Sequence, residues 1–135
     1  MSKVAVVYWS GTGNTEAMAN AVAEGCGGDL FTAADFDGSK MDSYDTVAFG
    51  CPAMGAEELE DGEFIPMFDS CKPKLAGKKI ALFGSYDWGD GEWMRLWEAD
   101  CRSLGANVVA EGLILHMEPD DEGLAKCRAL GEQLK

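Results

Sequence analysis

The sequence predicts an α/β fold, a three-layer α/β/α sandwich with a five-stranded parallel sheet in the middle. Apolar, β-branched runs recur along the chain, at Val4–Tyr8, Thr46–Gly50, Ile80–Gly84 and Val108–Met117. Each run except the last leads into glycine and then into a segment with helical periodicity. Runs that are apolar almost throughout are typical of strands covered on both faces and joined by right-handed crossovers.

Amphipathic segments lie between these runs and after the last one. Asn14–Cys26 carries Met18 and Val22 on one helical face, and Gly27 and Gly28 end the helix. The same spacing recurs at Trp93, Trp97, Cys101 and Leu104, and again at Leu124, Cys127, Leu130 and Leu134. We therefore expect all three segments to be helices packed on the sheet.

The remaining segments connect these elements. A short strand is expected at Asp29–Thr32, which brings the number of strands to five. Asp35–Tyr44 is polar and contains Gly38 and Ser39, so we interpret it as a solvated connection between the second and third strands. Glu111–Gly112 interrupts the last run, which predicts a bulge or bend at a sheet edge.

The length of 135 residues predicts a single domain that spans residues 1–135. No apolar run approaches the ~20 residues that cross a bilayer. The N-terminus leads straight into the first strand, without the apolar region of a secretory signal, so we expect a soluble, cytoplasmic protein. We also expect a monomer. The five cysteines are widely spread and form no C-x-x-C pair, which argues for buried small side chains rather than disulfides or a zinc site.

The chain is strongly acidic, with 24 acidic and 11 basic residues and a formal charge of −13. Nucleic acids and anionic membrane surfaces attract Lys and Arg, so neither is an expected partner. The charge fits a partner with a basic docking face. It also fits the simpler interpretation that acidity only confers solubility.

Three loops are candidates for a binding site because ligands of open parallel sheets lie beyond the carboxyl ends of the strands. We call them the first loop (Ser10–Thr15), the second loop (Cys51–Glu63) and the third loop (Ser85–Glu92). The first loop combines glycines, hydroxyl groups and an amide, with a helix starting directly behind it. Such a cluster of uncharged donors at a helix N-terminus predicts binding of a phosphate monoester.

Other phosphate-binding motifs do not fit the first loop. It has no lysine for the G-x-x-x-x-G-K-[ST] motif, and Glu16–Ala17 stand where the dinucleotide motif G-x-G-x-x-G needs its third glycine. A cysteine phosphatase would need an arginine in the loop after its nucleophile, and none follows Cys51 for more than forty residues. A mononucleotide is therefore the better hypothesis.

The other two loops suggest what else the ligand contains. Trp88 lies among acidic and glycine residues in the third loop, outside any core periodicity. The second loop offers Met54 as a soft apolar contact and Gly55 as a position free to adopt positive φ. Together they could enclose a planar ring, although Trp88 could instead serve an interface or a lid, and Met54 could fill the core.

At these residues the chain resembles the flavodoxins, specifically the short-chain type of anaerobic bacteria, along essentially its whole length. Ser10–Glu16 is similar to the family's FMN-phosphate loop, Met54–Gly55 to its inner flavin contact, and Gly84–Met94 to its outer loop. The resemblance implies the strand order 2-1-3-4-5 and one non-covalent FMN. It also implies an electron carrier rather than an enzyme.

The resemblance also implies roles for single residues. Ser10, Thr12, Asn14 and Thr15 would bind phosphate, Met54 and Trp88 would contact the inner and outer flavin faces, and Glu57 would bind flavin N3. The peptide after Gly55 would turn over on reduction, so that its carbonyl accepts a hydrogen bond from N5 of the semiquinone. The full set of expected cofactor-binding residues is Ser10, Gly11, Thr12, Gly13, Asn14, Thr15, Pro52, Ala53, Met54, Gly55, Ala56, Glu57, Ser85, Tyr86, Asp87, Trp88 and Gly89.

Two of these residues depart from the family pattern. Pro52 stands where many relatives have a serine, which removes one hydroxyl contact. Asp87 replaces the glycine that is usual before the stacking tryptophan, which leaves the local backbone geometry open.

Acidic residues around the ring would set its redox behaviour. They are Glu57, Glu58, Glu60, Asp61, Glu63, Asp87, Asp90 and Glu92. Their negative field opposes the addition of a second electron, which predicts a low-potential one-electron carrier that uses the semiquinone/hydroquinone couple. The resemblance implies redox-enzyme partners of ferredoxin type.

Two alternatives use the same fold. A small FMN-dependent NAD(P)H reductase would need a second pocket with basic residues near the loops, which we do not find in the sequence. A receiver module without flavin would need paired acids after the first strand, where Trp9–Ser10 stand, and a lysine after the last, where His116–Met117 stand. We interpret His116 as structural.

Overall fold

The computed structural model describes residues 3–55 and 58–135. The strands are β1 (Val4–Tyr8), β2 (Asp29–Thr32), β3 (Thr46–Gly50), β4 (Lys79–Tyr86), β5 (Asn107–Val108) and β6 (Leu113–His116). The helices are α1 (Asn14–Cys26), α2 (Phe64–Cys71), α3 (Glu92–Ser103) and α4 (Asp121–Leu134), with short 3₁₀ turns η1 (Ala33–Asp35), η2 (Gly38–Ser43) and η3 (Lys72–Lys74). All strand pairs are parallel, in the order β2-β1-β3-β4-β5, with β6 also paired to β4. The predicted α/β class and strand order are confirmed.

The last apolar run forms two strands that share one edge position of the sheet. Asn107–Val108 pairs with the start of β4, and Leu113–His116 pairs with its end. The predicted interruption at Glu111–Gly112 is confirmed, because residues 109–112 leave the sheet between β5 and β6. A Cβ atom at Gly112 would lie 2.6 Å from the Met94 sulfur, so the backbone here passes close to α3.

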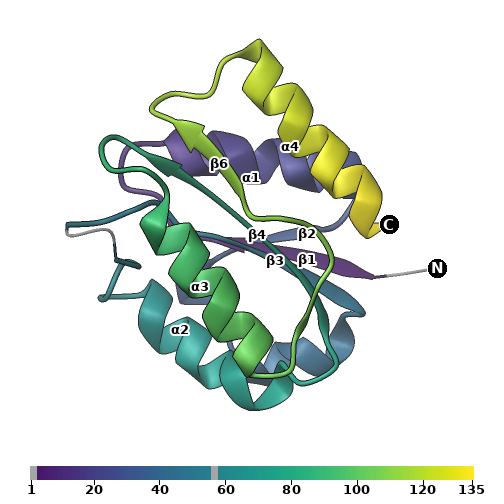
Figure 1. Ribbon diagram of the computed structural model, residues 1–135. Coiled ribbons are helices and arrows are strands. Elements are labelled where there is room, and N and C mark those ends of the chain that lie inside the picture. Colours follow the sequence, from purple (N-terminus) through teal and green to yellow (C-terminus); the bar gives the residue numbers. More distant parts are fainter. Residues whose placement is uncertain (1–2, 56–57) are drawn as a thin grey trace.

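The helices cover both faces of the sheet. Figure 1 shows α1 and α4 side by side on one face and α2 and α3 on the other. Alternate residues of each strand point to opposite faces, as the period of two requires. Ala5 and Val7 of β1 join the core under α2 and α3, whereas Val6 joins the core under α1 and α4.

Helices α1 and α4 touch through glycines. A Cβ atom at Gly131 of α4 would lie 2.2 Å from the carbonyl oxygen of Val22, and one at Gly25 of α1 would lie 2.1 Å from that of Arg128. Both distances are far shorter than any van der Waals contact. The two helix backbones can approach this closely only because neither position carries a side chain.

One expectation about the connections was incomplete, and one is wrong. The sequence predicts a helical segment after Thr46–Gly50 without giving its bounds, and the structure places this helix, α2, at Phe64–Cys71, directly after the second loop. The segment Asp35–Tyr44 is not merely a solvated connection, since Phe36, Met41 and Tyr44 are buried in the core under α2 and α3. These apolar side chains are spaced irregularly among polar ones, so the average polarity of the segment hides them.

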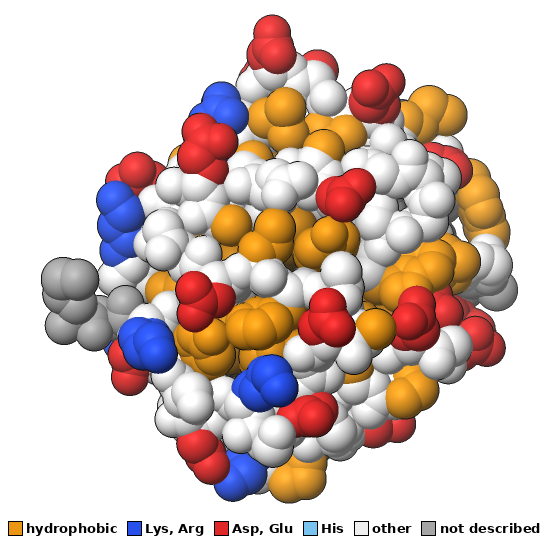
Figure 2. All heavy atoms as spheres, turned by 180° about the vertical axis from the view of Figure 1, so that it is seen from behind, with side chains coloured by type: hydrophobic (Ala, Val, Ile, Leu, Met, Phe, Trp, Pro, Cys, Tyr) orange, Lys and Arg blue, Asp and Glu red, His pale blue; other side chains and the backbone are white. Residues whose placement is uncertain are grey.

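Most cysteines lie in the interior, and carboxylates lie on the surface of this acidic chain. Cys51, Cys71, Cys101 and Cys127 are buried free thiols, as expected, and Cys26 is partly exposed. Figure 2 shows carboxylates spread over one face of the molecule, with hydrophobic side chains in patches between them. Within residues 3–55 and 58–135, no helix is both long and apolar enough to cross a membrane.

Candidate functional site

The three predicted loops meet at the carboxyl ends of β1, β3 and β4. A cavity of about 130 Å³ lies between them. Its lining residues are Trp9, Gly11, Thr12, Asn14, Pro52, Ala53, Met54, Ser85, Tyr86 and Asp87. Residues far apart in the sequence are thus brought to one place, where the order of the strands reverses between β1 and β3.

The first loop is shaped by its own hydroxyl groups. The Gly13 N–H donates to Ser10 Oγ at 3.0 Å, and the Asn14 N–H donates to Thr12 Oγ1 at 3.4 Å. Gly13 has a φ of 95°, which a glycine adopts without strain, and α1 begins directly after it. In both bonds the hydroxyl oxygen accepts, so each hydroxyl hydrogen remains free to donate to an anion.

Thr15 and Ser85 form a buried pair beneath the first loop. Their hydroxyl oxygens lie 2.7 Å apart, and both side chains are buried. Only one of the two hydroxyl groups can donate across this contact, so the other hydrogen is free to bond elsewhere. The pair joins the first turn of α1 to the end of β4 and thereby fixes the first loop relative to the third.

The second loop is held against β4 and α3. The Ala53 N–H donates to the Ser85 carbonyl at 3.0 Å, and the Trp93 indole N–H donates to the Cys51 carbonyl at 3.2 Å. Pro52 lies between these two anchors. The backbone at the start of this loop is therefore fixed relative to the end of β4.

The tip of the second loop is a closed turn. Met54 and Glu58 exchange two backbone hydrogen bonds of 2.8 and 2.9 Å, and Gly55 inside the turn has a φ of 50°. Ala56 and Glu57, both expected at the site, lie outside the described residues.

The third loop turns at glycines and not at Asp87. Gly89 and Gly91 have φ angles of 90° and 93°, whereas Met117 is the one non-glycine residue with positive φ within residues 3–55 and 58–135. The backbone at Asp87 therefore does not need a glycine, and an aspartate at this position is compatible with the turn of the third loop.

Two large apolar side chains lie exposed on the second and third loops. Met54 is 37% exposed and Trp88 is 61% exposed. Burying such side chains releases free energy in proportion to the apolar area removed from water, so exposed ones on neighbouring loops indicate a partner surface. A flat apolar ligand between the loops would cover both.

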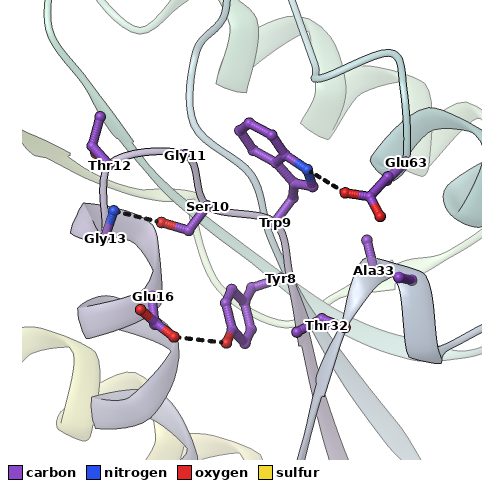
Figure 3. A pocket seen from close by; sticks show the side chains of 11 residues that line it. Tyr8, Trp9, Ser10, Gly11, Thr12, Gly13, Glu16, Thr32, Ala33 and Glu63 are labelled. Atoms are coloured by element: carbon purple, nitrogen blue, oxygen red, sulfur yellow. Dashed lines mark hydrogen bonds between the residues drawn. The ribbon is translucent and has the colours of Figure 1, made fainter.

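Trp9 is a site residue that the sequence reasoning missed. It lines the cavity described above and also a larger one of about 530 Å³ on the β2 side of the first loop. Figure 3 shows its indole N–H pointing at Glu63, to which it donates at 3.0 Å, and Tyr8 donating to Glu16 at 3.2 Å. Burial, followed by the charge of Glu16, raises the pKa of Tyr8. The sequence signal that could have identified Trp9 as a site residue is its position directly before the first loop.

The acidic residues near the loops are not equivalent. Glu60 is buried, and its carboxylate accepts hydrogen bonds from the N–H groups of Gly62, Glu63 and Phe64 at 2.6, 2.8 and 2.7 Å. Burial raises the pKa of Glu60, but these three N–H groups outweigh it and hold the pKa below its usual value. Glu60 therefore organises the start of α2 and is not simply one of several surface charges.

Neither nucleophilic cysteine chemistry nor metal chemistry is supported at the loops. Burial raises the pKa of Cys51 to about 12, so its thiol stays protonated near neutral pH. In the part of the chain that the structure describes, no three His, Cys, Asp or Glu side chains are grouped to hold a metal ion. The site offers instead uncharged hydrogen-bond donors near two exposed apolar side chains, an arrangement that suits a ligand with a phosphate and a planar ring.

Comparisons with known proteins agree with this geometry. The profile of a family described as flavodoxin matches residues 6–131. The chain is 47% identical over 135 residues to a flavodoxin of Megasphaera elsdenii and 44% identical over 134 residues to one of Clostridium beijerinckii, with 96% of both chains covered in each case. A solution structure of the two-electron reduced Megasphaera elsdenii flavodoxin matches with a TM-score of 0.85 at 45% identity, covering 97% of each chain. The oxidised Flavodoxin 1 of Bacillus cereus matches with a TM-score of 0.86 at 29% identity, covering 98% of this chain and 97% of that one.

Proposed function

This chain belongs to the flavodoxin family of FMN-binding electron carriers, and we propose that it is a low-potential one-electron carrier that shuttles electrons between redox enzymes. It is an electron-transfer protein and not an enzyme. FMN, bound non-covalently, supplies the redox chemistry. We also propose that residues 1–135 form one FMN-binding domain.

The described residues fit FMN on the evidence of their own geometry. A phosphate needs several donors, and the first loop presents hydroxyl groups, backbone N–H groups and the N-terminus of α1 without a basic residue. We assign phosphate binding to Ser10, Thr12, Asn14 and Thr15. The Thr15 hydroxyl contacts Ser85, so one hydrogen of this pair is left to donate to the ligand.

The exposed side chains of Met54 and Trp88 support a ring site between the second and third loops. We assign the inner face to Met54 and the outer face to Trp88, with Pro52, Ala53, Tyr86 and the backbone of residues 85–89 around the ring. Glu57 keeps its proposed bond to flavin N3, and Ala56 its place beside the ring, although both lie outside the described residues.

Gly55 supports a redox-linked turn of the second loop. Its φ of 50° lies in the left-handed region, and nothing lies within 4 Å of where its Cβ would be. The two hydrogen bonds between Met54 and Glu58 hold the base of the turn. The peptide that follows Gly55 can therefore reorient toward the ring while the rest of the loop stays in place.

The charge of the chain supports redox partners with basic docking faces. The formal charge of −13 and the exposed carboxylates of Glu58, Asp61, Asp87 and Glu92 would steer a basic surface toward the loops. We propose ferredoxin-type donors and acceptors as this partner class. We also propose a cytoplasmic location, because the free thiols suit a reducing compartment. We propose in addition that the protein is a monomer.

The observation that carries the proposal is the meeting of the uncharged first loop with Met54 and Asp87, the residue directly before the exposed Trp88, around one cavity at one end of the sheet. It is tested by the visible spectrum of the purified protein during anaerobic potentiometric reduction. We expect bound FMN and two separate one-electron steps, the second at low potential, with no bleaching by NADH alone. A single two-electron step, or rapid bleaching by NADH, would indicate a reductase instead.

A further inference from the structure

Contacts from the end of β6 hold the third loop in place, and the proposed electron-carrier function assigns no role to them. His116 Nε2 lies 2.9 Å from the carbonyl oxygen of Asp87, the residue directly before Trp88. A carbonyl oxygen can only accept, so Nε2 carries the hydrogen and donates it. The imidazole also packs on Tyr86, with the ring centroids 5.0 Å apart.

Two further contacts join β6 to the third loop. The Met117 N–H donates to the Tyr86 carbonyl at 2.7 Å, and a Cβ atom at Gly91 would lie 2.8 Å from Ile114 Cδ1. Met117 has a φ of 59°, a conformation that non-glycine residues rarely adopt and that persists only where the surrounding contacts impose it. The strained residue thus lies directly beside His116.

Between these attachments, Trp88 extends into solvent. On the far side of Trp88 the Asp90 carbonyl accepts a hydrogen bond from Arg95 at 3.0 Å. The carbonyl groups before and after the exposed indole are therefore both held by basic side chains, one from β6 and one from α3. The loop is fixed at its two ends and presents only its middle.

We propose that His116 is a positioning residue for Trp88: its Nε2–H holds the Asp87 carbonyl and so preorganises the third loop to cover the outer face of the flavin. The inference rests on the proposed FMN site. Preorganisation improves affinity because the loop loses less conformational freedom on binding. His116 itself does not touch the ring.

The test compares FMN dissociation constants of the apoprotein and three variants, measured by quenching of flavin fluorescence. His116→Leu removes the donor and should weaken FMN binding by about 2- to 10-fold, the range expected for one hydrogen bond. His116→Gln keeps an N–H donor at similar reach and should recover most of the affinity. Glu118→Gln, a nearby exposed position, is the control and should stay within about twofold of wild type.

A second readout needs neither FMN nor a variant. In the ¹⁵N NMR spectrum of the apoprotein at mildly alkaline pH, His116, the one histidine of the chain, should carry its hydrogen on Nε2. Equal affinities for wild type and His116→Leu, an equal loss in the Leu and Gln variants, or the Nδ1–H tautomer would overturn the proposal. If wild-type apoprotein binds no FMN, the proposed function fails, whereas the NMR result still shows whether His116 donates.

Discussion

The hydroxyl groups of Thr15 and Ser85 lie 2.7 Å apart in the protein interior, where α1 begins and β4 approaches its end. This contact ties the proposed phosphate site to the loop that carries Trp88. Breaking it should therefore affect both stability and ligand binding.

Replacing Thr15 with Val keeps the shape of the side chain but leaves Ser85 Oγ buried without this partner. We expect a loss of about 1–3 kcal/mol in the free energy of unfolding of the apoprotein, measured by urea denaturation. The double variant Thr15→Val/Ser85→Ala should lose less than the sum of the two single variants, because both remove one contact. Ser43→Ala, at an exposed hydroxyl far from the loops, should leave stability within about 0.5 kcal/mol. Strictly additive losses would show that the pair does not interact.

The Glu60 carboxylate predicts a pH-dependent contribution to stability. Its pKa is held below the usual value of 4.5, so its contribution is fully present above that pH and is lost as the pH falls through the lowered pKa of the folded state. Glu60→Gln should lower the free energy of unfolding by about 2 kcal/mol at neutral pH. The difference between the variant and wild type should shrink in urea titrations below about pH 4.5. A difference that stays constant down to strongly acidic pH would contradict the role of the charge.

The contact between α1 and α4 predicts a reversal of the usual effect of glycine substitution. Helix propensity alone would make Gly131→Ala stabilising by about 1 kcal/mol. Because the new Cβ would lie 2.2 Å from the Val22 carbonyl, we expect a destabilisation of about 2–3 kcal/mol instead. Glu132→Ala, exposed on the same helix, is the control and should stay within about 0.5 kcal/mol of wild type. A stabilised Gly131→Ala would show that the helices can separate at little cost.

The salt bridge between Arg95 and Asp90 predicts opposite effects of its two partners on the flavin potential. Arg95 pairs with the Asp90 carboxylate at 3.0 Å, whereas among the described residues no cation pairs with that of Asp87. Asp87→Asn should raise the potential of the second electron by roughly 20 to 40 mV, the order of magnitude that Coulomb's law gives for the loss of one nearby solvent-exposed charge. Asp90→Asn also removes a negative charge and should raise the potential as well, whereas Arg95→Gln leaves the Asp90 carboxylate uncompensated and should lower it. If Arg95→Gln leaves the potential unchanged or raises it in potentiometric titrations, the salt bridge has no effect on the field at the flavin.

The sequence predicted the sheet well because its strands are buried on both faces. Val4–Tyr8 and Thr46–Gly50 are apolar throughout, so their bounds agree with β1 and β3. The bounds of helix α2 were not predicted, because the helix is short and follows a long loop, with N–H groups at its start bound by Glu60 rather than by a Ser or Thr. A carboxylate that reaches across a turn is decided by the folded backbone, and local sequence rules do not reveal it.

The candidate site was predictable to a similar extent. The glycines and hydroxyls of the first loop and the isolated Trp88 are local signals, and the fold brings their loops together. The sequence did not reveal the place of Trp9 in the site or the contact between Thr15 and Ser85. Both depend on hydrogen bonds between segments more than fifty residues apart. Such contacts are fixed by strand order and register, which no local pattern contains.

The most direct test of the account is isothermal titration of the apoprotein with FMN and with riboflavin, which differ only in the phosphate group. If the uncharged first loop binds the phosphate, FMN should bind with one-to-one stoichiometry and at least about tenfold more tightly than riboflavin, since several charge-assisted hydrogen bonds are lost with the phosphate. Equal affinities for the two flavins, or no binding of either, would contradict the account.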